Sequence, residues 1–259
     1  MCIRDRSTPT PEDAADRETA SAQGSGLASH GLSGHPTTPT ARLVSALPVI
    51  VGFIALAIGV TVTQETYESV QSGRGAAAFD EPVQTWMVAH RTPWLDTVAT
   101  WFTHLGGKVG MTILATVTVL ALARRWRTWS PVLIMLWATA GSLTLTTLGK
   151  TLTARARPPA AQAVPPLETS ASFPSGHTLN AVLVTSIIGY LVLLHVRSRR
   201  VQLLTWCGLA LFATLLGLSR IYLGHHWLTD VIAGAAVGGA WAAAVILGHH
   251  LYLRLRADP

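Results

Sequence analysis

Six long apolar runs are the feature that most constrains how this chain can fold. They lie at Leu43–Thr63, Val109–Ala123, Ser130–Gly149, Thr178–Val196, Val201–Leu218 and Trp227–Leu253. A helix rises about 1.5 Å per residue, so runs of this length can cross the roughly 30 Å of hydrocarbon in a bilayer. The second run is the shortest, and we expect its helix to recruit residues from Gly106 onward. Together the runs predict an all-α, polytopic membrane protein, a six-transmembrane helical bundle.

The residues before the first run have a different composition. Ser, Thr, Pro, Ala and Gly dominate residues 1–41, and such a segment cannot bury enough apolar area to offset the entropy lost on ordering. We expect a disordered N-terminal tail over 1–41 and one membrane domain over 42–259. A cleaved signal peptide has its apolar stretch near the start, so the run that begins at Leu43 is expected to be a retained anchor.

The connection between the first two runs carries a helical pattern of its own. Its apolar side chains recur at helical spacing, at Trp94, Leu95, Val98, Trp101, Phe102 and Leu105. This pattern predicts an interfacial amphipathic helix between spans one and two. A Trp-bearing anchor at headgroup depth is the favoured interpretation, and a lid or lipid guide beside an active site is the alternative.

Charge and cysteine content narrow the class of protein further. Only 12% of the residues are charged, about half the usual share of a soluble domain. The net charge is +6, but the cations stand in short clusters between apolar runs, so no nucleic-acid partner is expected. The two cysteines, Cys2 and Cys207, are too few for a disulfide framework.

The distribution of cations predicts an orientation in the membrane. With both termini cytoplasmic, most of the nineteen Lys and Arg residues lie inside, as the positive-inside rule requires. The cations left outside are Arg74, Arg91, Lys108, Lys150, Arg155, Arg157 and Arg220. We therefore expect a multi-pass plasma-membrane protein with cytoplasmic N- and C-termini and an active site on the extracytoplasmic face.

Reactive side chains gather where spans three to six meet that outer face. Lys150 and Arg157 are seven residues apart, so a helix that continues to Pro158 would project both from one side and let them bind one anion. Ser175-Gly176 precedes an apolar helix, whose N-terminal N–H groups favour phosphate oxygens. His226 and Asp230 are one helical turn apart, a spacing that lets the carboxylate orient a nucleophilic imidazole.

These three segments resemble the signature of the type 2 phosphatidic acid phosphatase and vanadium haloperoxidase superfamily. The signature reads Lys, six residues, Arg-Pro; then Pro-Ser-Gly-His; then Ser-Arg, five residues, His, three residues, Asp. Every fixed position is present: Lys150, Arg157-Pro158, Pro174 to His177, Ser219-Arg220, His226 and Asp230. The resemblance covers about residues 43–256, and the six-span layout is similar to the membrane lipid phosphatase branch.

The resemblance implies an integral membrane lipid phosphatase. It would hydrolyse a terminal phosphate from a lipid phosphate or polyprenyl diphosphate through a phosphohistidine. His226 would be the nucleophile, Asp230 its orienting acid and His177 the general acid. The phosphate would be bound by Lys150, Arg157, Ser175, Gly176 and Arg220.

Partners and cofactors follow from the same residues. Asp230 is the one acid among the three motifs, too few for a two-metal site, and three cations can hold the phosphate alone. We therefore expect a metal-independent enzyme without a cofactor, whose partners are the bilayer and a lipid phosphate. Phosphatidic acid, phosphatidylglycerophosphate and polyprenyl diphosphates remain open as substrates, as does the oligomeric state.

Two other functions remain open at this point. A non-catalytic transporter or channel could use the same cations to bind an anionic lipid or ion, although the cations stand at helix ends. A vanadate-dependent haloperoxidase could use the same anion site, although six membrane spans argue against it.

Several neighbours of the motifs are given structural roles. We expect His225 to be an interface residue, Arg155 to contact headgroups and Asn180 to make a packing hydrogen bond. The stripe of Gly234, Gly238 and Gly239 is expected to let span six pack closely. Glu168 is the one acid in the connection between the first two motifs, which is expected to form part of a headgroup wall.

Overall fold

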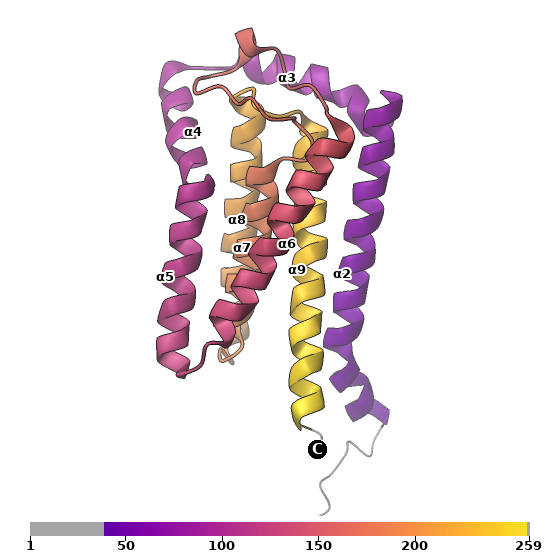
Figure 1. Ribbon diagram of the computed structural model, residues 1–259, viewed down its shortest axis with the longest axis vertical. Coiled ribbons are helices and arrows are strands. Elements are labelled where there is room, and N and C mark those ends of the chain that lie inside the picture. The colour runs from indigo at the N-terminus through magenta and orange to yellow at the C-terminus, as the bar shows by residue number, and fades with distance from the viewer. Residues whose placement is uncertain (1–38, 258–259) are drawn as a thin grey trace, which may run out of the picture. The chain divides into compact units, whose positions relative to one another are not determined.

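The computed structural model describes residues 39–257, and every regular element in this part of the chain is helical. The elements are α2 (Pro39–Ser72), η1 (Gly75–Phe79), α3 (Asp80–Ala89), α4 (Pro93–Leu105), α5 (Lys108–Trp126), α6 (Ser130–Thr153), η2 (Ala160–Gln162), α7 (Gly176–Leu193), α8 (Arg199–Tyr222) and α9 (Leu228–Ala257) (Figure 1). Six of the described helices, α2 and α5 to α9, are long and apolar enough to span a membrane. The six predicted spans are thereby confirmed. The predicted disordered tail lies outside the described residues as far as position 38.

The short helices of the first connection were only partly predicted. Helix α4 covers the range of the predicted amphipathic helix, and it begins at Pro93 after an extended Thr92. Helix α3 was not predicted, and it starts at Asp80, whose carboxylate is buried. The first span also continues past Thr63 to Ser72.

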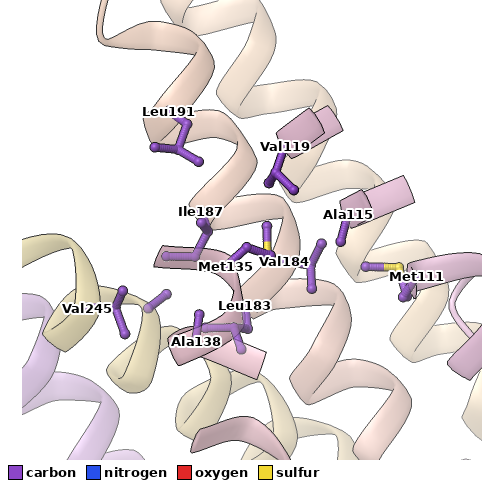
Figure 2. Packing of buried hydrophobic residues seen from close by; sticks show 11 residues of the cluster. Met111, Ala115, Val119, Met135, Ala138, Leu183, Val184, Ile187, Leu191 and Val245 are labelled. Carbon is purple, nitrogen blue, oxygen red and sulfur yellow. The ribbon is translucent and has the colours of Figure 1, made fainter. Parts of the chain in front are cut away.

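Helix α7 forms the centre of the bundle. It packs against α9, α8, α6 and α5. Over half of its spanning window, 56%, is buried, against 6% for α2. Figure 2 shows the cluster that surrounds it, built from side chains of α5, α6, α7 and α9, namely Met111, Ala115, Val119, Met135, Ala138, Leu183, Val184, Ile187, Leu191, Ala242 and Val245.

Small residues bring α9 against α7, as predicted. A Cβ on Gly234 would lie 2.6 Å from the Ser175 carbonyl oxygen, and one on Gly238 would lie 2.5 Å from the Leu179 carbonyl oxygen. Close approach of two spanning helices is favoured where such residues meet, because lipid offers no hydrophobic force between helices. Gly239 stands outside this tight contact, with Val182 at 3.9 Å.

The end of α6 differs from the prediction. The helix does not continue to Pro158 but ends at Thr153, where Ala154 adopts a left-handed conformation (φ 45°) and its N–H bonds the Lys150 carbonyl. A left-handed residue of this kind closes the last helical turn. Arg155 and Arg157 therefore lie on an irregular segment and not on the helical face that carries Lys150.

One end of the bundle collects the ends of four helices. Helices α6 and α8 finish there, α7 and α9 begin there, and α3 runs across the same end (Figure 1). Helix α3 packs against both α8 and α9. The segment between α6 and α7 also folds over this end, so the predicted site residues are gathered by the topology of the bundle.

Candidate active site

Lys150 and Arg157 converge on the segment between α6 and α7. Lys150 Nζ donates to Ser170 Oγ at 3.0 Å and to the Ala171 carbonyl. Arg157 donates through Nη2 to the same Ser170 Oγ at 3.1 Å and through Nε to the Ser170 carbonyl at 2.7 Å. Both cations also line an open cleft of about 540 Å³. The two predicted phosphate-binding cations thus share one site although they do not share a helix.

His226 lies in the turn before α9, with a different group at each ring nitrogen. Its Nε2 faces Arg157 Nη1 at 3.2 Å, and its Nδ1 lies 3.5 Å from Asp230 Oδ2. The prediction that both residues stand on one helical turn was wrong, because α9 begins only at Leu228. Asp230 Oδ2 instead accepts the Trp227 N–H at 2.9 Å, which holds the turn against the helix as a cap does.

Burial sets the protonation state of His226. The side chain is 2% exposed, and burial lowers the pKa of His226 to about 4, with Asp230 opposing the shift and Arg157 and Arg220 adding to it. The imidazole is therefore neutral near pH 7. A neutral ring that keeps its proton on Nδ1 toward Asp230 leaves Nε2 as an acceptor, and in this structure its lone pair accepts the Arg157 Nη1–H.

Asp230 is fully buried and held from several sides. Oδ2 accepts a hydrogen bond from Ser172 Oγ as well as from Trp227, and Oδ1 accepts from Arg155 Nη1 at 2.6 Å. The prediction that Arg155 contacts headgroups was wrong. Its guanidinium also donates from Nη2 to Asp80 Oδ2 at 2.6 Å, because the chain beyond α6 turns Arg155 toward the start of α9.

Arg220 is the most deeply buried cation of the site. The residue is 2% exposed, and its guanidinium donates to Thr103 Oγ1 at 3.1 Å and to Glu168 Oε1 at 2.7 Å. Its Nε has no hydrogen-bond partner. A buried donor without a partner is costly, so this arginine has spare capacity to bind an anion. We call Lys150, Arg157 and Arg220 the cation seat.

Glu168 occupies the cation seat in this structure. Its second oxygen lies 3.8 Å from Arg157 Nη2. Burial would raise the pKa of Glu168, but Arg220, Arg157 and His177 together lower it to about 2. The carboxylate is therefore ionised and bridges two of the three cations. The predicted wall residue thus places its carboxylate between Arg220 and Arg157.

The first turn of α7 carries the remaining predicted residues. Ser175 Oγ accepts the Thr178 N–H at 3.5 Å and lies 3.0 Å from Thr178 Oγ1, so its hydroxyl caps the helix. Its backbone N–H bonds the Asp230 carbonyl at 3.0 Å. Gly176 is the first residue of α7.

His177 follows Gly176, and its ring lies beside the turn that joins α4 and α5. Its Nε2 would lie 3.6 Å from a Cβ on Gly107 in that turn.

Of two neighbours that were given structural roles, Asn180 makes the predicted packing hydrogen bond, whereas His225 is buried inside the protein and is not an interface residue. His225 is 4% exposed, and its Nε2 lies 2.7 Å from the Val164 carbonyl. Its own carbonyl accepts Arg157 Nη1 at 2.5 Å. Asn180 Oδ1 accepts from Ser142 Oγ at 2.6 Å, which joins α6 to α7 below the site.

Sequence reasoning missed Asp80, Ser172 and Thr229. Thr229 Oγ1 and its N–H both bond Asp80, at 2.7 and 2.9 Å. Asp80 belongs to a connection that precedes the first motif, and no local spacing links it to Asp230. An Asp-Glu pair after an Ala-rich run, at the start of a helix, is the one signal it offers. No three His, Cys, Asp or Glu side chains within the described residues are grouped so as to hold a metal ion.

Comparison with known proteins connects this site to a family. The PAP2 superfamily model matches residues 131–253. Phosphatidylglycerophosphatase B of Bacillus subtilis (strain 168) is 34% identical over 160 residues, which are 61% of this chain and 77% of that protein. Lipid phosphate phosphatase delta of Arabidopsis thaliana is 34% identical over 87 residues, 33% of this chain and 20% of that protein.

A solved structure agrees with these sequence matches. The transmembrane PAP2-type phosphatidylglycerolphosphate phosphatase from Bacillus subtilis superposes with a TM-score of 0.66 at 29% identity, over 73% of this chain and 94% of that one. The likeness therefore covers the bundle as well as the motifs. The chain belongs to the PAP2 superfamily, in its branch of membrane-embedded phosphatases.

Proposed function

We propose that this protein is a lipid phosphatase that removes a terminal phosphate through a phosphohistidine formed on His226, without a metal ion. The observation that carries the proposal is the pairing at His226: a neutral, buried imidazole whose Nε2 faces Arg157, 3.2 Å away, in the cation seat. A phosphoryl group whose oxygen takes over the Arg157 N–H would therefore meet an unprotonated nitrogen lone pair.

The first half-reaction forms one bond and breaks another. His226 Nε2 attacks phosphorus, the N–P bond forms and the bond to the lipid oxygen breaks. His177 gives its proton to the leaving oxygen. Asp230 holds the Nδ1 proton and stabilises the positive charge that the ring acquires, while the cation seat stabilises the non-bridging oxygens.

The second half-reaction returns the enzyme to its starting state. His177, now neutral, takes a proton from water, which attacks phosphorus and releases inorganic phosphate from His226. The N–H groups at the start of α7, including that of Gly176, favour an anion near the helix N-terminus. The Ser175 hydroxyl contributes by capping that helix.

A lipid substrate is supported by the surroundings of the seat. An apolar groove of about 510 Å³ lies between α2, α6 and α9, and it reaches Gly149, Phe173 and Pro174 beside the site. Because Gly149 precedes Lys150, a hydrocarbon chain in the groove would end close to the cations. A phosphate of phosphatidic acid, phosphatidylglycerophosphate or a polyprenyl diphosphate satisfies this description.

Clusters of arginine support one orientation of the protein in the membrane. The end of the bundle opposite the site carries Arg124, Arg125, Arg127, Arg197, Arg199, Arg200, Arg254 and Arg256. Such clusters are retained in the cytoplasm. We therefore place the active site on the extracytoplasmic face and the C-terminus in the cytoplasm.

Phosphate release by the purified protein in detergent tests the proposal. We expect hydrolysis of a long-chain lipid phosphate in excess EDTA and its loss in His226→Ala, with Cys207→Ala as a control on an exposed position. Hydrolysis that persists in His226→Ala would refute the phosphohistidine. Acid-labile incorporation of ³²P into the wild type, absent from His226→Ala, would support it directly. Lipid or anion flux in liposomes without turnover would favour a transporter instead.

A further inference from the structure

Asp230 is the centre of a buried charge cluster that the family motifs do not describe. Arg155 lies between two carboxylates, with Nη1 on Asp230 Oδ1 and Nη2 on Asp80 Oδ2, each at 2.6 Å. The side chains of Asp80 and Asp230 are 5% and 0% exposed. We call Asp80, Arg155 and Asp230 the carboxylate cluster.

The cluster is tied to α9 as well as to itself. Asp80 accepts the Thr229 N–H at 2.9 Å and the Thr229 hydroxyl at 2.7 Å, and Arg155 Nη1 donates to the same hydroxyl at 2.7 Å. Thr229 is adjacent to Asp230. Asp80, from the other end of the domain sequence, therefore fixes the first turn of the helix on which Asp230 stands.

We infer that Asp80 and Arg155 are positioning residues for His226, which they control through the orientation and the charge of Asp230. This inference rests on the proposed function. Arg155 fixes one oxygen of the Asp230 carboxylate, which leaves the other to face the imidazole. Asp80 in turn shares the positive charge of Arg155, so that Asp230 is not fully neutralised by it.

The net charge of the carboxylate cluster determines how it acts on His226. Two carboxylates and one guanidinium leave one net negative charge beside His226, which stabilises the positive ring formed during phosphoryl transfer. Without Asp80 the cluster is neutral, and without Arg155 it carries two negative charges. The two substitutions therefore act on His226 in opposite directions.

The other charged groups around His226 are common to all variants. Besides Asp230, they are Arg157 after α6, Arg220 at the end of α8 and His177 at the start of α7. None of these belongs to the carboxylate cluster. A difference between Asp80→Asn and an Arg155 variant therefore reports the cluster alone.

The test is a pair of pH profiles of turnover. In Asp80→Asn we expect kcat to fall on the order of 10-fold to 100-fold while KM stays within about twofold, since the cation seat is intact. The acidic limb should shift to lower pH by about one unit, because the protonated ring loses a negative neighbour. In Arg155→Met the limb should shift to higher pH by a similar amount.

Three further variants separate charge from packing. Arg155→Lys keeps the charge, so its limb should stay at the wild-type position with a smaller loss of kcat. The double variant Asp80→Asn with Arg155→Met restores one net negative charge, and its limb should return toward that of the wild type. Glu81→Gln, at the exposed neighbouring position of α3, should change nothing.

The outcomes distinguish this inference from the proposed function. Opposite limb shifts in the two single variants support the cluster's role, whereas unshifted limbs or shifts in one direction overturn it.

If the wild type shows no turnover, the proposed function fails, and NMR titration of ¹⁵N-histidine-labelled protein reads the His226 pKa in the same variants. If Asp80→Asn does not fold, Asp80→Glu can replace it, because this variant keeps the negative charge and moves the carboxylate. Its kcat should fall while the acidic limb of its pH profile stays at the wild-type position. A wild-type kcat in Asp80→Glu would overturn the inference.

Discussion

Arg155 and Arg157 stand two positions apart, and their surroundings differ in kind. Arg155 binds two buried carboxylates, each at 2.6 Å. Arg157 binds backbone carbonyls and a serine hydroxyl, and its nearest carboxylate is Glu168 at 3.8 Å. Arg155 is thus neutralised by permanent partners, whereas Arg157 keeps charge available for a ligand.

The same contrast separates the two regions to which these residues belong. The carboxylate cluster is closed, because its charges are paired with one another and because Arg155 and Asp80 also form hydrogen bonds with Thr229. The cation seat is open, since Arg220 Nε has no partner and Glu168, the acid that bridges Arg220 and Arg157, is a third exposed. Removing one partner of a buried ion pair strongly destabilises a protein. The partly exposed carboxylate of Glu168, in contrast, can be replaced by a phosphate. In the proposed mechanism, the closed region orients the nucleophile and the open region binds the substrate phosphate.

Arg157→Lys is expected to have the largest effect on the seat. A lysine cannot reproduce the fork that contacts Ser170, the His225 carbonyl and His226 Nε2 at once. We expect kcat/KM to fall on the order of 100-fold, with a rise in KM. Steady-state kinetics on a lipid phosphate measure this, and Arg155→Lys serves as the matched comparison.

The comparison between the two arginines fails under one specific result. If Arg155→Lys raises KM as much as Arg157→Lys does, Arg155 also binds the phosphate and the two regions are not distinct. Wild-type kinetics in Arg157→Lys would remove Arg157 from the seat altogether.

The next largest effect that we expect is the loss of turnover at acidic pH, when His226 becomes protonated. The folded pKa of His226 is lowered by burial to about 4, so its neutral, nucleophilic form predominates above that value. Turnover should persist as the pH falls through 6 and should be lost only near pH 4, about tenfold for each further unit. The measurement is kcat/KM against pH, corrected for ionisation of the substrate phosphate near pH 6. A limb near 6.5 would show that His226 titrates like an exposed histidine.

The sequence predicted the open seat better than the closed cluster. All three cations of the seat, Lys150, Arg157 and Arg220, belong to motifs of fixed spacing, whereas only Asp230 of the cluster does; the six spans follow from hydropathy alone. Arg155 could not be assigned, because its direction depends on the left-handed Ala154 that ends α6. Its partner Asp80 is 75 residues away in the sequence, and such pairing is decided by the topology of the bundle, which no local pattern encodes.

Glu168→Gln should have a smaller effect. It should strengthen anion binding, whereas Arg157→Lys should weaken it. If the cation seat binds phosphate as proposed, the glutamate competes with it for Arg220 and Arg157, and the substitution frees both cations. Because Glu168 is partly exposed, we expect inorganic phosphate to inhibit only about threefold more strongly. The inhibition constant for phosphate measures this, with the exposed Thr169→Ala as control. An unchanged or weaker inhibition would show that Glu168 does not occupy the phosphate position.

Ser142→Ala should have the smallest effect and should leave both regions unchanged. Ser142 is fully buried and donates to Asn180 at 2.6 Å, joining α6 to α7 within the bundle. Hydrogen bonds between membrane helices contribute about 0.6 kcal/mol on average, so we expect a slightly lower melting temperature in detergent. The pH profile, KM and phosphate inhibition should match the wild type, because the ends of α6 and α7 are also joined through Gly149, which packs against Pro174. A changed KM in Ser142→Ala would mean that the cation seat is positioned by packing deep in the bundle and not only by contacts at its end.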